Sequence, residues 1–148
     1  MGRAGGAVAE TSLAREIDLA GLSEEGARLW RQLPPGSVVW LSGDLGSGKT
    51  TLAQAVTAAA GAERARSPTF ALVHEYSSRE GPVVHVDCYR LRQPEEARDL
   101  DLAALARRSR LTLIEWPERA GRFAPPADRH VRLSHASQPE LRTLEILV

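Results

Sequence analysis

The stretch Gly43-Asp44-Leu45-Gly46-Ser47-Gly48-Lys49-Thr50 fits the phosphate-binding pattern G-x-x-x-x-G-K-[ST]. An apolar run, residues 37–42, precedes it and is typical of a strand that is buried on both faces. The alanine-rich residues 50–60 follow it and predict a helix. Glycines let backbone N–H groups converge on a phosphate, and the helix adds its positive N-terminal end. The context of strand, loop and helix therefore predicts a functional phosphate loop.

Lys49 is the only lysine in the chain, since the other eighteen basic residues are arginines. A lysine ammonium is a compact point charge, whereas a guanidinium is a planar fork too wide for a tight phosphate loop. The lysine scarcity is a compositional bias, but it makes this exception informative. It also excludes the Asn-Lys-x-Asp motif by which Ras-type GTPases select guanine, so ATP is favoured over GTP.

Length and composition set the broad class. The chain has 148 residues and a formal net charge of zero, so we expect one domain, residues 1–148, without a global basic field for nucleic acid. The single cysteine, Cys88, excludes an internal disulfide and predicts a packed thiol. No apolar run approaches the roughly 20 residues of a membrane helix, and no signal peptide is apparent. We expect a soluble, cytoplasmic protein with a disordered start, about residues 1–12.

Alternation of strand and helix patterns predicts an α/β fold, with a mainly parallel central sheet flanked by helices and added antiparallel strands. We expect a short edge strand at 15–19, a helix capped by Ser23 that runs to about Leu33, and a helical region from Pro94 to about Ser109. Further strands are expected at 37–42, 70–76, 83–87, 111–115, 129–134 and 141–148, the last two as a hairpin.

Two of the predicted strands end on acids, Asp87 and Glu115. The site of an open α/β sheet lies at the carboxyl ends of its parallel strands, so both acids are expected beside the phosphate loop. One would hold Mg²⁺ together with the Thr50 hydroxyl, and the other would orient the attacking water. Spacing does not decide which acid does which. Thr69 is either a switch residue that senses the γ-phosphate or an ordinary turn residue.

Several motifs together resemble the TsaE (YjeE) family of small bacterial ATPases. The resemblance covers about residues 22–135 and rests on the phosphate loop and on three further stretches: Ser67-Pro68-Thr69-Phe70, His85-Val86-Asp87-Cys88-Tyr89-Arg90-Leu91 and Leu113-Ile114-Glu115-Trp116-Pro117-Glu118. Many proteins share the loop, whereas the H-x-D-x-Y-R and I-E-W-P stretches are far more specific.

The resemblance implies a P-loop nucleoside triphosphatase fold and Mg²⁺-dependent ATP hydrolysis, weak without partners. It implies a role in threonylcarbamoyladenosine modification of tRNA beside the anticodon, acting on a complex of TsaD and TsaB, with tRNA as an indirect partner through that complex. We expect no membrane partner. It makes Glu115 the favoured metal ligand. The predicted catalytic residues are Lys49, Asp87 and Glu115, the predicted metal ligands Thr50, Thr69, Asp87 and Glu115, and the predicted nucleotide contacts Asp44, Leu45, Gly46, Ser47, Gly48, Lys49, Thr50, Thr51 and Trp116.

Alternatives remain open at this point. A small-metabolite kinase would need a substrate-binding lid, which residues 94–110 could supply. A non-catalytic nucleotide-sensing module would bind ATP without turnover. Trp116 could be a core or rim aromatic instead of a wall of the nucleotide site, and the arginines at 107, 108 and 110 could be a solvated helix end or a contact for RNA or an acidic partner.

Overall fold

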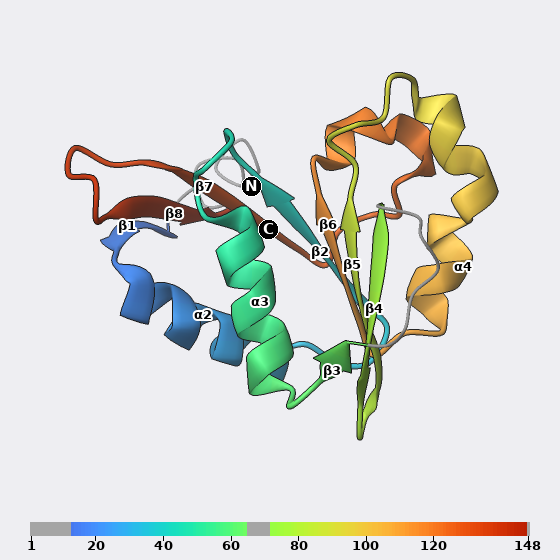
Figure 1. Cartoon of the computed structure of the whole chain (residues 1–148), viewed down its shortest axis with the longest axis horizontal. Coiled ribbons are helices and arrows are strands. Elements are labelled where there is room, and N and C mark those ends of the chain that lie inside the picture. The colour runs from blue at the N-terminus through green and yellow to red at the C-terminus, as the bar shows by residue number, and fades with distance from the viewer. Residues whose placement is uncertain (1–12, 65–71, 148) are drawn as a thin grey trace, which may run out of the picture.

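The computed structural model of the chain describes residues 13–64 and 72–147. Within these residues eight strands form one sheet in the order β1-β8-β7-β2-β6-β5-β4-β3 (Figure 1). The strands are β1 (Leu13–Ile17), β2 (Ser37–Ser42), β3 (Glu63–Arg64), β4 (Val73–Ser78), β5 (Gly81–Asp87), β6 (Leu111–Glu115), β7 (Arg129–His135) and β8 (Arg142–Ile146).

The centre of the sheet is parallel and its margins are antiparallel. β2 pairs in parallel with both β6 and β7, and β6 pairs in parallel with β5. β4 and β3 on one side, and β8 and β1 on the other, add antiparallel strands. The predicted fold class and the predicted hairpin of β7 with β8 are confirmed. The carboxyl ends of β2, β5 and β6 therefore meet at one edge of the sheet.

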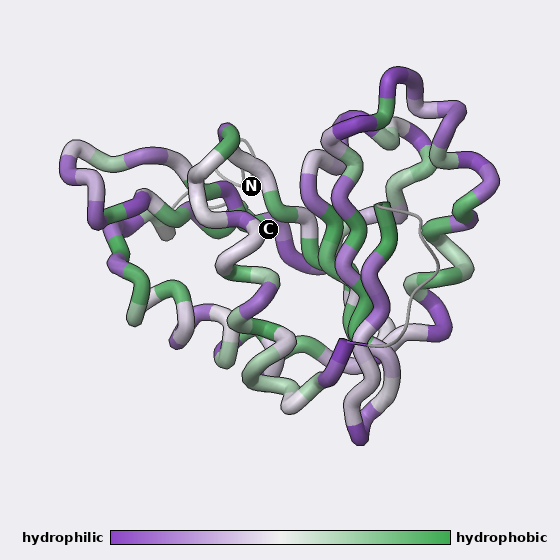
Figure 2. The backbone as a smooth tube through the Cα atoms, viewed as in Figure 1, coloured by the Kyte–Doolittle hydropathy of each residue, from purple (hydrophilic) through white to green (hydrophobic). Residues whose placement is uncertain are grey.

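Side chains alternate between the two faces of these central strands, because successive residues of a strand point to opposite sides. Val39, Leu41 and Leu113 belong to a core that α2 (Leu19–Gln32) and α3 (Lys49–Ala59) cover. Val84 and Ile114 belong to the core of the other face, which α4 (Leu102–Arg107) covers. Figure 1 shows α2 and α3 on one side of the sheet and α4 on the other, and Figure 2 shows the hydrophobic residues along the central strands.

The predicted start of the first helix was wrong. α2 begins at Leu19, because the Asp18 side chain caps it by accepting a hydrogen bond from the N–H of Gly21 at 2.8 Å. Ser23 is therefore an exposed residue inside the helix. Both residues are good caps, and the edge strand that ends at Ile17 fixed where the chain turns into the helix.

The predicted helical region from Pro94 is divided in two. A 3-10 helix, η1 (Pro94–Leu100), ends at Asp101, which adopts a left-handed φ of 47° and caps α4 through its carboxylate. Residues 117–123 contain two single turns, η2 (Pro117–Arg119) and η3 (Gly121–Phe123). A left-handed residue cannot continue a helix, so the break at Asp101 turns the chain back onto the sheet.

Other boundaries shift by a few residues. The edge strand predicted at 15–19 is β1, and the strand predicted at 70–76 begins at Val73 in the described part of the chain. The segment predicted to be disordered at the start lies outside the described residues. None of the helices in the described part of the chain is long and apolar enough to cross a membrane.

Gly26 sets the approach of α2 to α3, and its replacement tests this packing. A Cβ at this position would lie 2.5 Å from Cβ of Ala55 and 2.8 Å from its carbonyl carbon, so the helices must separate. We expect Gly26→Ala to lower the free energy of unfolding by about 1–3 kcal/mol, measured by urea denaturation. Ser23→Ala on the exposed side of the same helix is the matched control, with a change within about 0.5 kcal/mol. Equal effects of the two variants would contradict the packing.

Candidate active site

The loop between β2 and α3 depends on glycines at both of its ends. Gly43 has a φ of 142°, and a Cβ there would lie 2.1 Å from the carbonyl oxygen of Leu133 on the adjacent strand β7. Gly48, the N-cap of α3, has a φ of 108°, a conformation that other residues adopt only with strain. The glycine pattern read from the sequence is thus a requirement of the loop backbone.

The first turn of α3 opens into a cavity. Lys49, Thr50 and Thr51 line this cavity, and their backbone N–H groups have no hydrogen-bond partner among residues 13–64 and 72–147. Unpaired N–H groups and the positive end of the helix dipole attract an anion such as phosphate.

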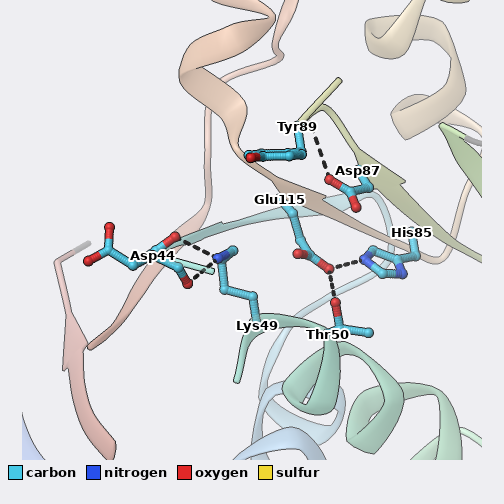
Figure 3. A network of polar contacts seen from close by, with 8 residues as sticks. Asp44, Lys49, Thr50, His85, Asp87, Tyr89 and Glu115 are labelled. Atoms are coloured by element: carbon cyan, nitrogen blue, oxygen red, sulfur yellow. Dashed lines mark hydrogen bonds and ion pairs between the residues drawn. The ribbon is translucent and has the colours of Figure 1, made fainter. Parts of the chain in front are cut away.

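Lys49 is held at the centre of the loop with 4 % of its surface exposed. Its Nζ donates hydrogen bonds to the carbonyl oxygens of Gly43 at 2.5 Å and Asp44 at 2.9 Å (Figure 3). It also lies 4.6 Å from the ring centre of Trp116. Burial lowers the pKa of the ammonium from its usual value, although the nearby carboxylates of Glu115 and Asp87 oppose this effect. The lysine therefore sits where a bound anion would add favourable charge.

Glu115 is a carboxylate buried at the end of the central strand β6, with 3 % exposure. Its Oε2 accepts a hydrogen bond from Thr50 Oγ1 at 2.9 Å and another from His85 Nε2 at 2.6 Å (Figure 3). Burial by itself would raise the pKa of this carboxyl. The hydrogen bonds from His85 and Thr50 and the charge of Lys49 outweigh burial and lower the pKa, so the group is an ionised acceptor near neutral pH.

Asp87 lies beside Glu115, because the two residues are register partners across β5 and β6. Its Oδ1 accepts a hydrogen bond from the N–H of Tyr89 at 3.0 Å, and the side chain is only partly buried at the cavity wall. The expectation that the two acids meet beside the phosphate loop is therefore confirmed by the sheet. Their environments differ, since Glu115 is buried between donors and Asp87 faces the cavity.

An aromatic pair forms the wall next to these acids. Trp116 has a left-handed φ of 56°, which turns the chain sharply after β6. Its ring centre lies 5.0 Å from that of Tyr89, and the Arg119 guanidinium lies over both rings and donates to the Tyr89 carbonyl at 2.9 Å. Trp116 thus lines the cavity and also packs against the core on the face of the sheet that α4 covers.

The cavity has a volume of about 360 Å³. The two acids, the phosphate loop, the start of α2 and residues around the β7–β8 turn contribute to its lining. The residues that line it are Asp18, Leu19, Leu22, Leu45, Gly46, Gly48, Lys49, Thr50, Thr51, Asp87, Tyr89, Glu115, Trp116, Pro139, Glu140 and Arg142.

Most of the predicted nucleotide contacts are in this lining, and two are not. Asp44 contributes a carbonyl to Lys49, and the Ser47 hydroxyl is buried without a hydrogen-bond partner in the described part of the chain. Thr69 lies outside the described residues. The sequence reading missed Tyr89 as a wall residue and His85 as a partner of Glu115. The H-x-D spacing indicates that His85 lies on the same face of its strand as Asp87, since residues two apart share a face of a strand.

The donor set fits Mg²⁺ with a bound phosphate. Hard oxygen donors, the Thr50 hydroxyl and the carboxylates of Asp87 and Glu115, lie next to the first turn of α3. Within the described residues there is no group of three or more His, Cys, Asp or Glu side chains able to enclose a metal ion. Magnesium in phosphate sites is typically held by one or two carboxylates and by substrate oxygens and water, so a closed protein cage is not required.

Cys88 provides a test of the site's packing. It is fully buried, and burial raises the pKa of its thiol to about 12. Because the thiolate is the reactive form, we expect iodoacetamide to label the native protein at pH 8 at least tenfold more slowly than the urea-unfolded chain. As the only cysteine, it gives a single signal in mass spectrometry. Equal labelling rates in the two states would contradict the burial of this strand end.

Comparison with known proteins places this site in a family. Residues 18–144 match the family model of "Threonylcarbamoyl adenosine biosynthesis protein TsaE". Proteins named tRNA threonylcarbamoyladenosine biosynthesis protein TsaE are similar to the chain: that of Haemophilus influenzae is 34% identical over 74% of this chain and 69% of its own length. That of Aquifex aeolicus is 36% identical over 74% and 77%, and that of Streptomyces coelicolor 42% over 66% and 68%.

The fold also resembles a solved structure. The crystal structure of Bacillus subtilis YdiB superposes with a TM-score of 0.70 at 22% identity, covering 92% of this chain and 85% of that one. This likeness concerns the fold alone, and the sequence comparisons reach further. Because the family model matches residues 18–144, which are most of this chain, the chain belongs to the TsaE family of threonylcarbamoyl adenosine biosynthesis proteins.

Proposed function

We propose that the protein is an Mg²⁺-dependent ATPase required for threonylcarbamoyladenosine modification of tRNA next to the anticodon, acting on the TsaD–TsaB complex. The observation that carries this proposal is the hydrogen bond of 2.9 Å between the Thr50 hydroxyl and the buried Glu115 carboxylate, directly beside the phosphate loop and Asp87. Such a pair of hydroxyl and acid is what a metal-dependent phosphoryl transfer site requires. Family membership supports the biological role.

The residues that line the cavity suit both the phosphates and the base of ATP. Unpaired N–H groups in the first turn of α3 and the ammonium of Lys49 bind the phosphates. Leu19 and Leu22, which also line the cavity, give a base an apolar surface on α2. Leu19 is 66% exposed, so covering it with a base removes apolar surface from water.

The different environments of the two acids divide their roles. Glu115, fixed by two donors and next to Thr50, would hold Mg²⁺ with the Thr50 hydroxyl. Asp87, partly exposed at the cavity wall, would orient the attacking water. When bound, Mg²⁺ supplies positive charge that offsets the charge developing on the phosphate oxygens. Lys49 adds a second positive charge from the loop side.

The cationic side chains around the cavity suggest why ATP hydrolysis would depend on a partner. The cations among the lining residues are Lys49 and Arg142, and the Arg142 guanidinium is already engaged with the carbonyl oxygens of Pro139 and Leu141 and with that of Gly46 in the phosphate loop. Phosphoryl transfer without an arginine near the γ-phosphate is typically slow, and a partner often supplies the missing group. We therefore propose that hydrolysis is weak in the isolated protein and is stimulated by TsaD and TsaB.

The kinase alternative finds no support in the fold. The region from Pro94 to Arg110, which would have to form the lid, packs as η1 and α4 on the face of the sheet away from α3, and none of its residues lines the cavity. The sensing-module alternative differs from the proposal only in turnover, so hydrolysis measurements separate the two.

ATP turnover with and without TsaD and TsaB tests the proposal. We expect stimulation in the wild type and a loss of roughly a hundredfold or more in Lys49→Ala, Asp87→Asn and Glu115→Gln, since each removes a charge at the reacting phosphate. Asp99→Asn is the matched control, because Asp99 is an exposed carboxylate on η1 outside the cavity. Wild-type ATP binding without any stimulated hydrolysis would support the sensing module instead, and near-normal rates in all three variants would refute the site.

A further inference from the structure

His85 is a buried imidazole that the roles proposed above leave unassigned. It lies on β5 two residues before Asp87, so the two side chains share the face that α3 covers. Its register partner on β6 is Leu113, two residues before Glu115. The pairing of these two parallel strands therefore places the imidazole two residues before both acids on the same face of the sheet. Its exposed fraction is 6%.

The contact between His85 and Glu115 is short and its direction is defined. Nε2 lies 2.6 Å from Oε2 of Glu115, and both residues are buried (Figure 3). An ionised carboxylate only accepts hydrogen bonds, so Nε2 is the protonated ring nitrogen and donates. This holds whether the ring is neutral or charged, because both forms can carry a proton on Nε2.

The two oxygens of Glu115 have different surroundings. Oε2 accepts from both Thr50 and His85, whereas Oε1 has no hydrogen-bond partner among residues 13–64 and 72–147. Two donors from separate elements, α3 and β5, fix the position of Oε2. A planar carboxylate held at one oxygen has little freedom left, so the direction of Oε1 is set as well. Removing His85 would leave Thr50 as the only side-chain donor to this group in the described part of the chain.

We propose that His85 is a positioning residue, whose Nε2–H anchors Oε2 of Glu115 and so leaves Oε1 as the oxygen available to Mg²⁺. This inference rests on the proposed function, since it concerns the metal that accompanies the nucleotide. His85 is not among the residues that line the cavity, so it acts on metal binding through Glu115 and leaves metal-free nucleotide binding alone. Partners that orient metal ligands commonly affect metal affinity tenfold or more.

Three variants separate positioning from a structural role. His85→Leu fills the space without a donor, and His85→Gln keeps a neutral N–H donor of similar reach. His130→Leu is the matched control: His130 also lies on a central strand and is hydrogen-bonded, to Ser42 Oγ at 2.7 Å, but it packs against Trp40, outside the cavity. Binding of a fluorescent ADP analogue is titrated with Mg²⁺ and, separately, in EDTA, and ATP turnover is measured with TsaD and TsaB.

We expect His85→Leu to raise the Mg²⁺ concentration for half-maximal effect by roughly ten- to a hundredfold and to lower kcat more than it changes KM. Binding in EDTA should stay within about twofold, and His85→Gln should recover most of the loss. His130→Leu should lower the melting temperature without changing the Mg²⁺ dependence. If His85→Leu does not fold, His85→Asn, whose amide is too short to reach Oε2, replaces it.

The outcomes distinguish this inference from the proposed function. Unchanged Mg²⁺ dependence in His85→Leu, or an equal loss in His85→Leu and His85→Gln, would overturn the positioning role while leaving the ATPase intact. A parallel loss of binding in Mg²⁺ and in EDTA would also overturn it, because it would indicate general damage. A wild-type protein that binds the analogue without any Mg²⁺ effect would instead refute the metal site of the proposed function.

Discussion

The buried carboxylate of Glu115 is the constraint on which the rest of the site depends. An ionised group with 3 % exposure is costly to bury unless donors surround it. Thr50 supplies a donor from α3, His85 supplies another from β5, and Lys49 adds a positive charge. The carboxylate therefore ties the phosphate loop and the helix after it to the two parallel strands that end at the site.

The sequence was sufficient for the parts that depend on local chemistry. The phosphate loop was predictable because its backbone conformation requires glycines. Gly43 shows this directly, since a Cβ at this position would collide with the carbonyl oxygen of Leu133. The apolar runs at 37–42 and 111–115 predicted the strands β2 and β6, since strands buried on both faces have few alternatives. That both acids lie at the same edge of the sheet followed from the same patterns, because the carboxyl ends of parallel strands meet at one edge.

The parts that depend on long-range pairing were not predictable. The start of α2 at Leu19 depends on where β1 leaves the sheet, and the break at Asp101 depends on how the chain returns to its far face. The role of His85 depends on β5 lying directly beside β6, a pairing that no local pattern specifies. Only with the sheet order in hand do the imidazole and the Glu115 carboxylate become neighbours. These features share one cause. The local preferences of each residue allow more than one structure, and the position of a distant strand decides between them.

The central claim is that Thr50 and Glu115 act as one unit at the metal end of the site, and a double-mutant cycle tests it most directly. Thr50→Val, Glu115→Gln and the double variant are compared by the Mg²⁺-dependent affinity for a fluorescent ADP analogue, with binding in EDTA subtracted. The account predicts that the double variant binds the analogue no more weakly than the weaker-binding of the two single variants. The two losses in binding free energy are then coupled by about 1 kcal/mol or more. Losses that add to within about 0.5 kcal/mol would contradict it.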